Sequence, residues 1–408
     1  MTPAIPDARS GGMGLARTAI VQGPWSVAGN PAQLGGLGGF GFSASIILDQ
    51  VSEERSIEAI DQFNDVVTKN IYASNTNSFR KYAAALGYGF ELFAVAYAMV
   101  PIHDYGYKYS EEIRLSLSSS YYNRDPLAGY HILEMSGQVM GNYLGVSTAL
   151  GPLSLGGSFV LYTANDLLID KAVSVISVDD ALASDTSYRY QTTHKLEEST
   201  LGMNLGLSYE VNDDISLHYV IDKTGDLTFL SNGFVPYADS TLRYPEYRMA
   251  DSSLQYTLEK PAVHRFGIAF SPGQKQRTLA VFELELHQGQ TITYSESFQS
   301  SETFDYDLGD TRIYHVGLEH WASATLPLRM GYSYEESSLD KSLSMTQFTV
   351  GGSLIHGSFQ VDMSGQVSSL GYSYPDIFPP AGTSSIGTNE SVNESVLSLL
   401  VTASYKLP

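Results

Sequence analysis

Apolar and polar residues alternate with a period of two along much of this chain. Segment 201–210 illustrates the pattern: leucine, methionine and tyrosine occupy one face, and glycine, asparagine, serine and glutamate occupy the other. Segments 279–287, 328–335 and 358–369 repeat it. Strict alternation of this kind predicts β-strands with one apolar and one polar face.

About fourteen such strands can be read from the sequence, many close to the ten or so residues that a tilted strand needs to cross a bilayer. They are expected at 39–49, 79–90, 92–102, 135–150, 153–166, 196–210, 214–226, 261–271, 277–289, 311–323, 327–339, 345–355, 358–371 and 391–407. The connections between them alternate along the chain between short turns and longer segments, such as 50–78, 103–134, 167–195 and 227–260. That alternation is typical of an outer-membrane barrel, where all the short turns lie at one end.

The predicted fold is therefore all-β: a transmembrane antiparallel β-barrel of about fourteen strands over 39–408. The alternatives are a large soluble β-sandwich, a solenoid or a propeller, and the last two are weakened because no repeat of 20–50 residues is evident. The location of the charged residues on the polar faces distinguishes a barrel from these soluble folds. In a barrel they point into the lumen, and the residues concerned are Glu210, Arg265, Glu283, Glu285, Glu319, Arg329, Asp362 and Lys406.

Composition narrows the possible functions. The 408 residues carry a net charge of −21, which argues against a nucleic-acid partner, and they include no cysteine, so disulfides and thiolate metal sites are excluded. No run of 18 apolar residues predicts a transmembrane helix. The opening "MTPAIPDARSGG" lacks the basic and apolar regions of a signal peptide, so we expect a mature chain without one.

Glycines at Gly36, Gly38 and Gly41 match the pattern G-x-G-x-x-G. A dinucleotide-binding loop needs a strand before these glycines and a helix after them, whereas here a strand is expected to follow. We therefore interpret the glycines as the place where an N-terminal segment joins the first barrel strand.

Other candidate chemistry is weak. Segment 56–70 has apolar residues at helical spacing and predicts a short amphipathic helix over the barrel mouth, either as a cover or as a lid for substrate. Glu111 and Glu112 are adjacent, but a solvated loop explains them. The histidines are scattered without zinc-binding spacing, and no G-x-S-x-G motif is present. We predict no enzyme activity, no catalytic residues, no cofactor and no metal.

The N-terminal segment carries a specific resemblance. It contains "PDARSGGMG" from Pro6 and, about fifteen residues later, "NPA" at Asn30, Pro31 and Ala32. This resembles the start of mature proteins of the FadL-like outer-membrane family, most closely its PorV-type branch.

The resemblance implies an N-terminal hatch, here residues 1–38, inside the barrel lumen. Asn30, Pro31, Ala32, Gly36 and Gly38 are the expected hatch or gating residues, and Asn30–Ala32 are expected against the inner wall. The implied function is an outer-membrane channel for passive uptake of hydrophobic small molecules, either fatty-acid-like or aromatic. Its ligand would leave sideways into the membrane lipids through a wall opening near the glycines of 86–90 or 349–353. The alternative is a PorV-like carrier or scaffold of a type IX protein secretion system, with a secretion-machinery partner.

Overall fold

The computed structural model describes residues 6–60, 63, 65–114, 127–164, 167–175, 188–237, 246–249, 254–273, 277–295, 303–378 and 389–407. Its main feature is a closed antiparallel barrel, in which β1 pairs with both β2 and β23. The fourteen barrel strands follow one another around the wall as β1 (Phe40–Ile60), β2 (Val66–Gly89), β3 (Ala94–Asp104), β6 (Gln138–Leu150), β7 (Leu153–Ala164), β10 (Thr200–Glu210), β11 (Ile215–Thr224), β15 (Val263–Phe270), β16 (Thr278–His287), β19 (Thr311–Ser323), β20 (Leu326–Glu335), β21 (Met345–His356), β22 (Phe359–Pro375) and β23 (Asn389–Lys406). The predicted fold class is confirmed, and each predicted strand overlaps one of these.

Short connections lie at one end of the barrel, here called the short-turn end. They span 90–93, 151–152, 211–214, 271–277, 324–325 and 357–358. The first barrel strand starts at this end and the last one finishes there, because Gly41 pairs with Lys406. The other connections between barrel strands lie at the opposite, outer end.

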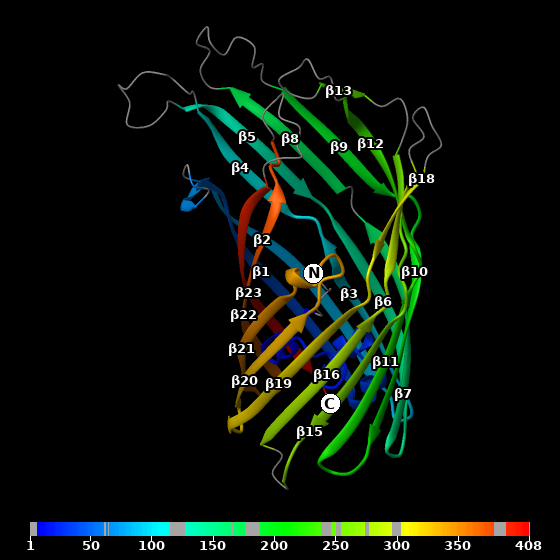
Figure 1. Cartoon of the computed structure of the whole chain (residues 1–408). Coiled ribbons are helices and arrows are strands. Elements are labelled where there is room, and N and C mark those ends of the chain that lie inside the picture. The colour runs from blue at the N-terminus through cyan, green and yellow to red at the C-terminus, as the bar shows by residue number, and fades with distance from the viewer. Residues whose placement is uncertain are drawn as a thin grey trace.

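The outer end differs from the sequence-based expectation, because several predicted loops contain strands. These strands form a second, nine-stranded sheet, here called the extension sheet. Its order is β18 (Thr303–Leu308), β17 (Gln290–Ser295), β14 (Leu254–Leu258), β12 (Leu227–Tyr237), β9 (Tyr188–Leu196), β8 (Leu167–Val175), β5 (Leu127–Ser136) and β4 (Tyr107–Arg114), with β13 (Glu246–Met249) paired to β12. Figure 1 shows this sheet standing above the barrel.

Each of the eight strands along this path continues a barrel strand after a short break. The breaks range from one residue, Gly137 between β5 and β6, to four residues, 259–262 between β14 and β15. Strands β1, β2, β22 and β23 instead run past the same level without interruption.

The helix predicted over 56–70 is wrong. Ser56–Ile60 form the end of β1, and Val66–Asn70 form the start of β2, paired across one hairpin. The register of this pair shifts between Arg55 and Ser56 and again between Ala59 and Ile60. These irregularities interrupt the period-two pattern, so the apolar residues fell by chance at helical spacing.

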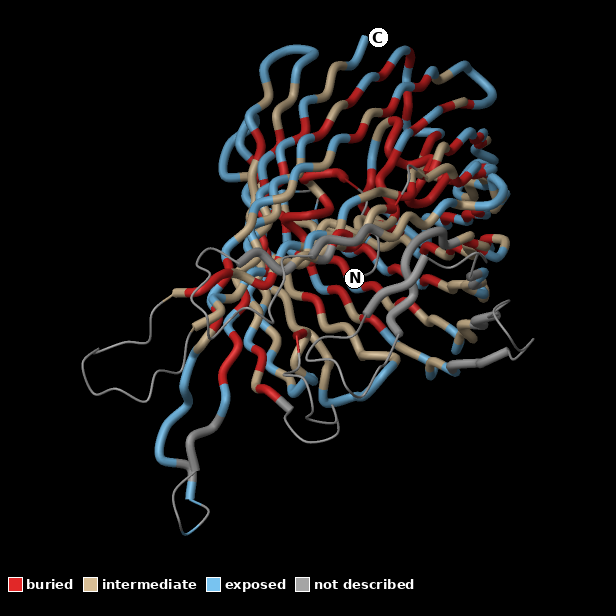
Figure 2. The backbone as a smooth tube through the Cα atoms, turned by 90° about the horizontal axis from the view of Figure 1, so that it is seen from above, coloured by how far each residue is buried: buried red, intermediate tan, exposed pale blue. Residues whose placement is uncertain are grey.

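The barrel wall is apolar outside, and its inner face carries polar side chains on many strands but mainly apolar ones on β3, β6 and β7. On β10, the side chains of Met203, Leu205 and Leu207 are exposed, whereas Asn204 and Ser208 are buried in the lumen. The same alternation runs around the wall, and Figure 2 shows buried and exposed residues alternating along the strands. This is the reverse of a soluble protein, where apolar residues face the interior.

The N-terminal segment lies within the ring of strands. It contains α1 (Ala8–Gly12) and the 3-10 helices η1 (Gly23–Val27) and η2 (Pro31–Gly36), and a further 3-10 helix, η4 (Lys341–Leu343), lies between β20 and β21. Residues 6–37 are called the hatch below. None of the helices in the described ranges is long and apolar enough to cross a membrane.

Candidate functional site

Asn30 ties the hatch to itself and to the wall. Its side chain is fully buried, and its Oδ1 accepts a hydrogen bond from the Ala32 backbone N–H at 3.1 Å. Its Nδ2 donates to the Thr18 carbonyl at 2.9 Å and to the Ser208 hydroxyl on β10 at 3.1 Å. Pro31 begins η2, where a missing N–H costs nothing. The Asn-Pro-Ala motif is therefore a turn packed directly against the inner wall.

Glycines in the wall make this close packing possible. A Cβ atom on Gly206 would lie 2.1 Å from Asn30 Oδ1, and one on Gly156 would lie 2.3 Å from the carbonyl carbon of Pro31. Both distances are far below van der Waals contact. The glycines of β7 and β10 thus form the seat of the hatch, a role that alternation alone did not reveal.

Gly36 and Gly38 are placed differently from the Asn-Pro-Ala turn. Both are exposed near the short-turn end, and a Cβ atom on either would have no neighbour within 4 Å. Strand β1 begins at Phe40, directly after them. The G-x-G-x-x-G match therefore leads into a strand, and it lacks the helix that a phosphate site requires.

A buried ionic network anchors the start of the hatch. Arg9 binds both carboxylate oxygens of Glu319, at 3.0 and 2.7 Å. Arg329 donates to the same carboxylate at 2.6 Å and to Asp362 at 2.7 Å. Positive and negative groups thus alternate from the hatch into β19, β20 and β22, so each buried charge has a partner.

A second network holds the middle of the hatch. Arg17 binds both oxygens of Glu285, at 3.0 and 2.7 Å, and Glu283 accepts the backbone N–H groups of Arg17 and Thr18, at 2.9 and 2.7 Å. Arg265 lies 3.3 Å from Glu285. Both acidic residues of β16 therefore bind the hatch.

His315 joins this second network from β19. Its Nδ1 lies 2.7 Å from the Gly14 carbonyl oxygen, and its Nε2 lies 3.2 Å from Glu285. Glu283, Glu285 and His315 lie close enough together to hold a metal ion. However, Arg17 and Arg265 already occupy the Glu285 carboxylate, and their positive charges oppose a cation. We interpret the cluster as an anchor of the hatch.

The structure buries six of the eight charged residues that the sequence placed in the lumen: Arg265, Glu283, Glu285, Glu319, Arg329 and Asp362. Glu210 and Lys406 are exposed at the short-turn end instead. Both lie at strand ends, where alternation no longer decides whether a side chain faces the lumen.

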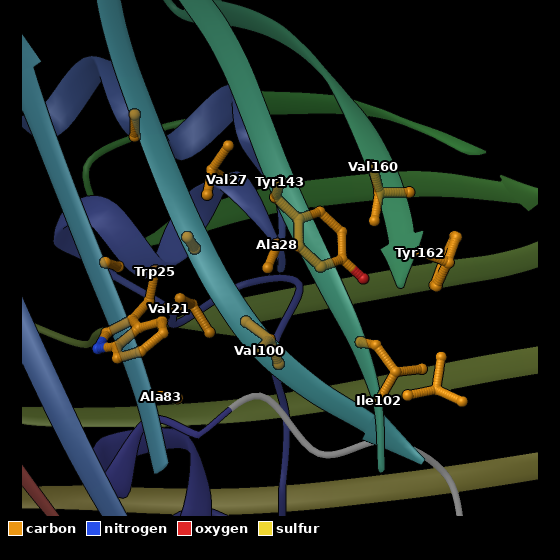
Figure 3. Close-up of a cluster of buried hydrophobic side chains, with 14 of the residues drawn as sticks. Val21, Trp25, Val27, Ala28, Ala83, Val100, Ile102, Tyr143, Val160 and Tyr162 are labelled. Atoms are coloured by element: carbon orange, nitrogen blue, oxygen red, sulfur yellow. The ribbon is translucent and has the colours of Figure 1, made fainter. Parts of the chain in front are cut away.

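The opposite side of the lumen is apolar. A cluster of buried hydrophobic side chains extends from the hatch residues Val21, Trp25 and Val27 across the inner faces of β3, β6 and β7 (Figure 3). It continues to Leu227 and Phe229 in the extension sheet. The lumen thus has an ionic half and a hydrophobic half, and alternation within single strands could not reveal this division.

Two adjoining cavities lie between the hatch and the outer end. The larger has a volume of about 570 Å³ and the smaller about 390 Å³, within the range of small-molecule sites. Ile102 and His103 line both cavities. The larger is bordered by Val100, Tyr143 and Tyr162 on one side and by Arg17, Asp222, Lys260 and Arg265 on another.

The smaller cavity lies at an interruption in the barrel wall, here called the window. Strands β2 and β3 pair only over Ala84–Gly89 and Ala94–Met99. Beyond that point β2 continues beside β1, whereas β3 has no further pairing with β2, and its register with β6 shifts between Pro101 and His103. The cavity is lined from both sides of this interruption, by Phe79 and Lys81 on β2 and by residues 101–106.

Polar side chains cross and border the window. The Lys81 ammonium lies 2.6 Å from Asp49 and 3.7 Å from Asp104, on the opposite side. Farther out, the Asn75 side chain donates a hydrogen bond to the Ser110 carbonyl on β4 and accepts one from the Ser110 N–H, each at 3.0 Å. Asn77 donates to the Lys108 carbonyl at 2.7 Å. Side-chain amides thus replace the missing backbone ladder beyond the window.

The wall opening predicted at 86–90 or 349–353 is wrong in both places. Gly87 pairs with Gly41 and Ala96, and Gly351 pairs with Arg329 and Ser364, so the ladder is intact on both sides of each glycine. The sequence signal that marks the window is Pro101, which cannot donate to a ladder.

The remaining candidate, Glu111 and Glu112, is not a paired acid site. Both are on β4, where successive side chains point to opposite faces. Glu111 accepts from Tyr109 and contacts His131, whereas Glu112 pairs with Arg114.

Solved structures share this fold over nearly the whole chain. A FadL homologue of Pseudomonas aeruginosa aligns with a TM-score of 0.68 and 11% identity over 100% of both chains. The toluene transporter TodX of P. putida aligns at 0.62 and 15%, covering 99% of this chain and 98% of its own. The toluene transporter TbuX of Ralstonia pickettii aligns at 0.58 and 17%, covering 100% and 98%. No protein-family model and no curated protein sequence matches this chain.

Proposed function

We propose that this chain, which has the fold of the FadL homologue and the toluene transporters, is an outer-membrane channel for small hydrophobic molecules. The observation that carries the proposal is the hydrophobic half of the lumen. It leads from the extension sheet to Ile102 and Tyr105, which also line the smaller cavity at the window between β2 and β3. The apolar surface of this cluster suits a hydrophobic ligand, while charged side chains such as Lys81 and Glu285 also line the smaller cavity.

The outer surface supports a membrane location. Large apolar side chains are exposed all around the barrel, including Phe159, Met330 and Phe348, which are 58–71% exposed. An exposed apolar surface of this extent marks contact with lipid. A closed barrel satisfies its backbone groups within lipid. In this arrangement the short-turn end faces the periplasm and the extension sheet faces outward.

The hatch and the window together suggest the route. The hatch fills the lumen toward the short-turn end and is fixed there by two ionic networks. A ligand that enters from the extension sheet therefore meets the hatch, which blocks a straight path to the short-turn end, and the window gives it a sideways exit into the lipid. The solved structures with this fold support such a role, since they include toluene transporters and a monoaromatic hydrocarbon channel, CymD.

Uptake by whole cells tests the proposal, because phospholipid vesicles are already permeable to small hydrocarbons. Cells with an outer membrane that express the chain should take up radiolabelled toluene faster than cells with an empty vector. Uptake of a sugar of similar size should not change. Equal toluene uptake in the two strains would contradict the proposed function.

The exit through the window can be tested separately, because the chain has no native cysteine. Tyr82 lies beside the window on β2 and Met330 lies on β20, and both are exposed to a similar degree, 57% and 58%. A bulky maleimide on Tyr82→Cys should lower toluene uptake, whereas the same label on Met330→Cys should not. If both labelled variants keep full uptake, the ligand does not leave through the window.

A role as carrier or scaffold in a secretion machine stays a prediction. No feature of the described surface favours it over transport.

A further inference from the structure

The short segment that follows β22 crosses to the extension sheet. It consists of Asp376, Ile377 and Phe378 and is here called the clasp. Phe378 is buried, and its ring lies flat on that of His131 on β5, with the centroids 4.5 Å apart and the planes inclined by 4°. The Phe378 ring also stacks with Tyr109 on β4 at a centroid distance of 6.2 Å. The clasp thus joins an unbroken barrel strand to β4 and β5, at one edge of the extension sheet.

A small hydrophobic core surrounds the clasp. Phe378, Tyr109 and Ala73 on β2 are its buried members. The partly buried side chains packed against them are Tyr72, Tyr107, Leu133 and Ile377. This core shares no residue with the hydrophobic half of the lumen, so it is a separate contact between the extension sheet and the long barrel strands.

A buried arginine crosses the same corner of the outer end. The Arg55 guanidinium on β1 lies 5.0 Å from the Tyr109 ring centroid and 6.0 Å from that of Tyr374 on β22. Arg55 also binds Glu53 at 2.5 Å and Glu390 on β23 at 3.3 Å. Cation–π and ionic contacts therefore connect β4 with β1, β22 and β23 beside the clasp.

Negative charge exceeds positive charge around the clasp. Arg55 is already paired with two carboxylates, and Glu111 on β4 contacts the His131 ring. Asp376 adds a further carboxylate, whose Oδ1 accepts the N–H of Phe378 at 2.8 Å. Ionised carboxylates in this corner repel one another, so the closed clasp favours protonation.

Asp376 shows the effect most directly. Burial raises the pKa of Asp376 above its ordinary 3.8, and the Glu111 charge adds to this. The hydrogen bond from the Phe378 N–H and the charges of His131 and Arg55 oppose the shift. The titratable groups around Asp376 come from five strands: Arg55, Tyr72, Glu111, His131 and Glu390. An acid whose pKa is raised in the closed state favours that state when protonated, so the clasp loses stability as the pH rises from 3.8 through the raised value.

We infer that residues 376–378 clasp the β4 edge of the extension sheet to the unbroken strands at the outer end of the barrel, and that this contact holds more tightly in mild acid than at neutral pH. The inference goes beyond the proposed channel function, because it concerns the opening of the outer end and not the ligand. Phe378 supplies the contact, and the carboxylates around it set its strength.

Thiol labelling of the purified full-length chain in detergent tests the clasp, because the chain has no native cysteine. Ala73→Cys places a thiol in the core beside Phe378, where Ala73 is 4% exposed, and Ser74→Cys places one on the exposed face of the same strand. Phe378→Ala should speed the reaction of Ala73→Cys with a small methanethiosulfonate about tenfold or more, since a stacked, buried ring is lost. Labelling of Ser74→Cys should not change.

A matched control removes a large apolar side chain from another outer connection. Leu339→Ala should leave the labelling rate of Ala73→Cys unchanged, because Leu339 is 76% exposed. If Ala73→Cys fails to fold, hydrogen exchange in β5 of the unmodified and Phe378→Ala chains replaces it, and faster exchange is expected in the variant.

The charge dependence has its own test. Asp376→Asn keeps the oxygen that accepts the Phe378 N–H and imitates the protonated acid, so at pH 7.5 it should slow labelling of Ala73→Cys about threefold or more. In the chain with Asp376 intact, the labelling rate of Ala73→Cys divided by that of Ser74→Cys should be lower at pH 5 than at pH 8. Asp376→Asn should reduce this difference.

Equal labelling of Ala73→Cys with and without Phe378→Ala would overturn the clasp. The same ratio at pH 5 and pH 8, with no effect of Asp376→Asn, would overturn its dependence on acid. Toluene uptake by cells is measured independently. A channel that transports toluene but shows none of these differences keeps its proposed function and lacks the clasp.

Discussion

Single residues decide how the hatch is held. Asn30 makes three hydrogen bonds in a space that exists only because β10 carries a glycine opposite it. Arg9 and Arg17 each bind both oxygens of a wall glutamate. The sequence placed these glutamates on an inward face, but it could not pair them with particular arginines, because a partner some 270–310 positions away depends on barrel closure.

Gly206→Ala tests the seat of the hatch. Its Cβ would overlap Asn30 Oδ1, so we expect the docked hatch to be destabilised by about 1–3 kcal/mol, the usual cost of overpacking. Arg9 and Arg17 are nearly buried in the docked hatch, so trypsin should cleave the variant at these residues faster than the unmodified chain. Gly365→Ala is the control, because its Cβ would meet only ordinary contacts at 3.7 Å or more. Equal cleavage of all three proteins would contradict this account.

Among whole elements, the barrel strands were predictable and the extension strands were not. Within the barrel, an apolar outer face and a lumen with many polar side chains impose strict alternation. Beyond that level water reaches both faces, so strands such as β4 and β9 carry polar residues on either side and resemble loops in sequence. The window was missed for a different reason. It is the point at which the pairing between β2 and β3 ends, and the sequence of a single strand says little about where its pairing with a neighbour ends.

The link between β2 and β4 consists of side chains and can be removed without altering either strand. In the double variant Asn75→Ala/Asn77→Ala, β4 should separate more often from β2. Loss of the hydrogen bond to Asn75 Oδ1 should speed hydrogen exchange at the Ser110 amide by about tenfold, since such a bond contributes about 1.4 kcal/mol. Thr76→Ala, which removes only an outer-face contact with Ser52, should leave that rate unchanged. Unchanged exchange in the double variant would show that the backbone alone holds β4.

Over the whole molecule, the number of barrel strands, the position of the short turns and the reversed polarity of the wall followed from period-two alternation. The division of the lumen into an ionic and a hydrophobic half did not. It depends on which strands become neighbours across the barrel, and therefore on the order of strands around the ring.

The row of breaks between barrel and extension sheet has a consequence for motion. Hydrogen bonds connect each extension strand sideways to its neighbours. The sheet is joined to the barrel below by short links between 105 and 310 and, among the described residues, by side-chain contacts such as those of Asn75 and Asn77 with β4. The barrel and the extension sheet should therefore open as separate cooperative units. Amides of β6, β7 and β10 should exchange far more slowly than those of β5, β8 and β9, although each of these barrel strands is joined to one of these extension strands by a short break in the chain. Along β22 and β23, which cross the same level unbroken, protection should decline gradually. Exchange measured by mass spectrometry on the detergent-solubilised protein would distinguish an abrupt loss of protection at the breaks from a gradual decline. A gradual decline along the broken and the unbroken strands alike would mean that the extension sheet moves with the barrel as one body.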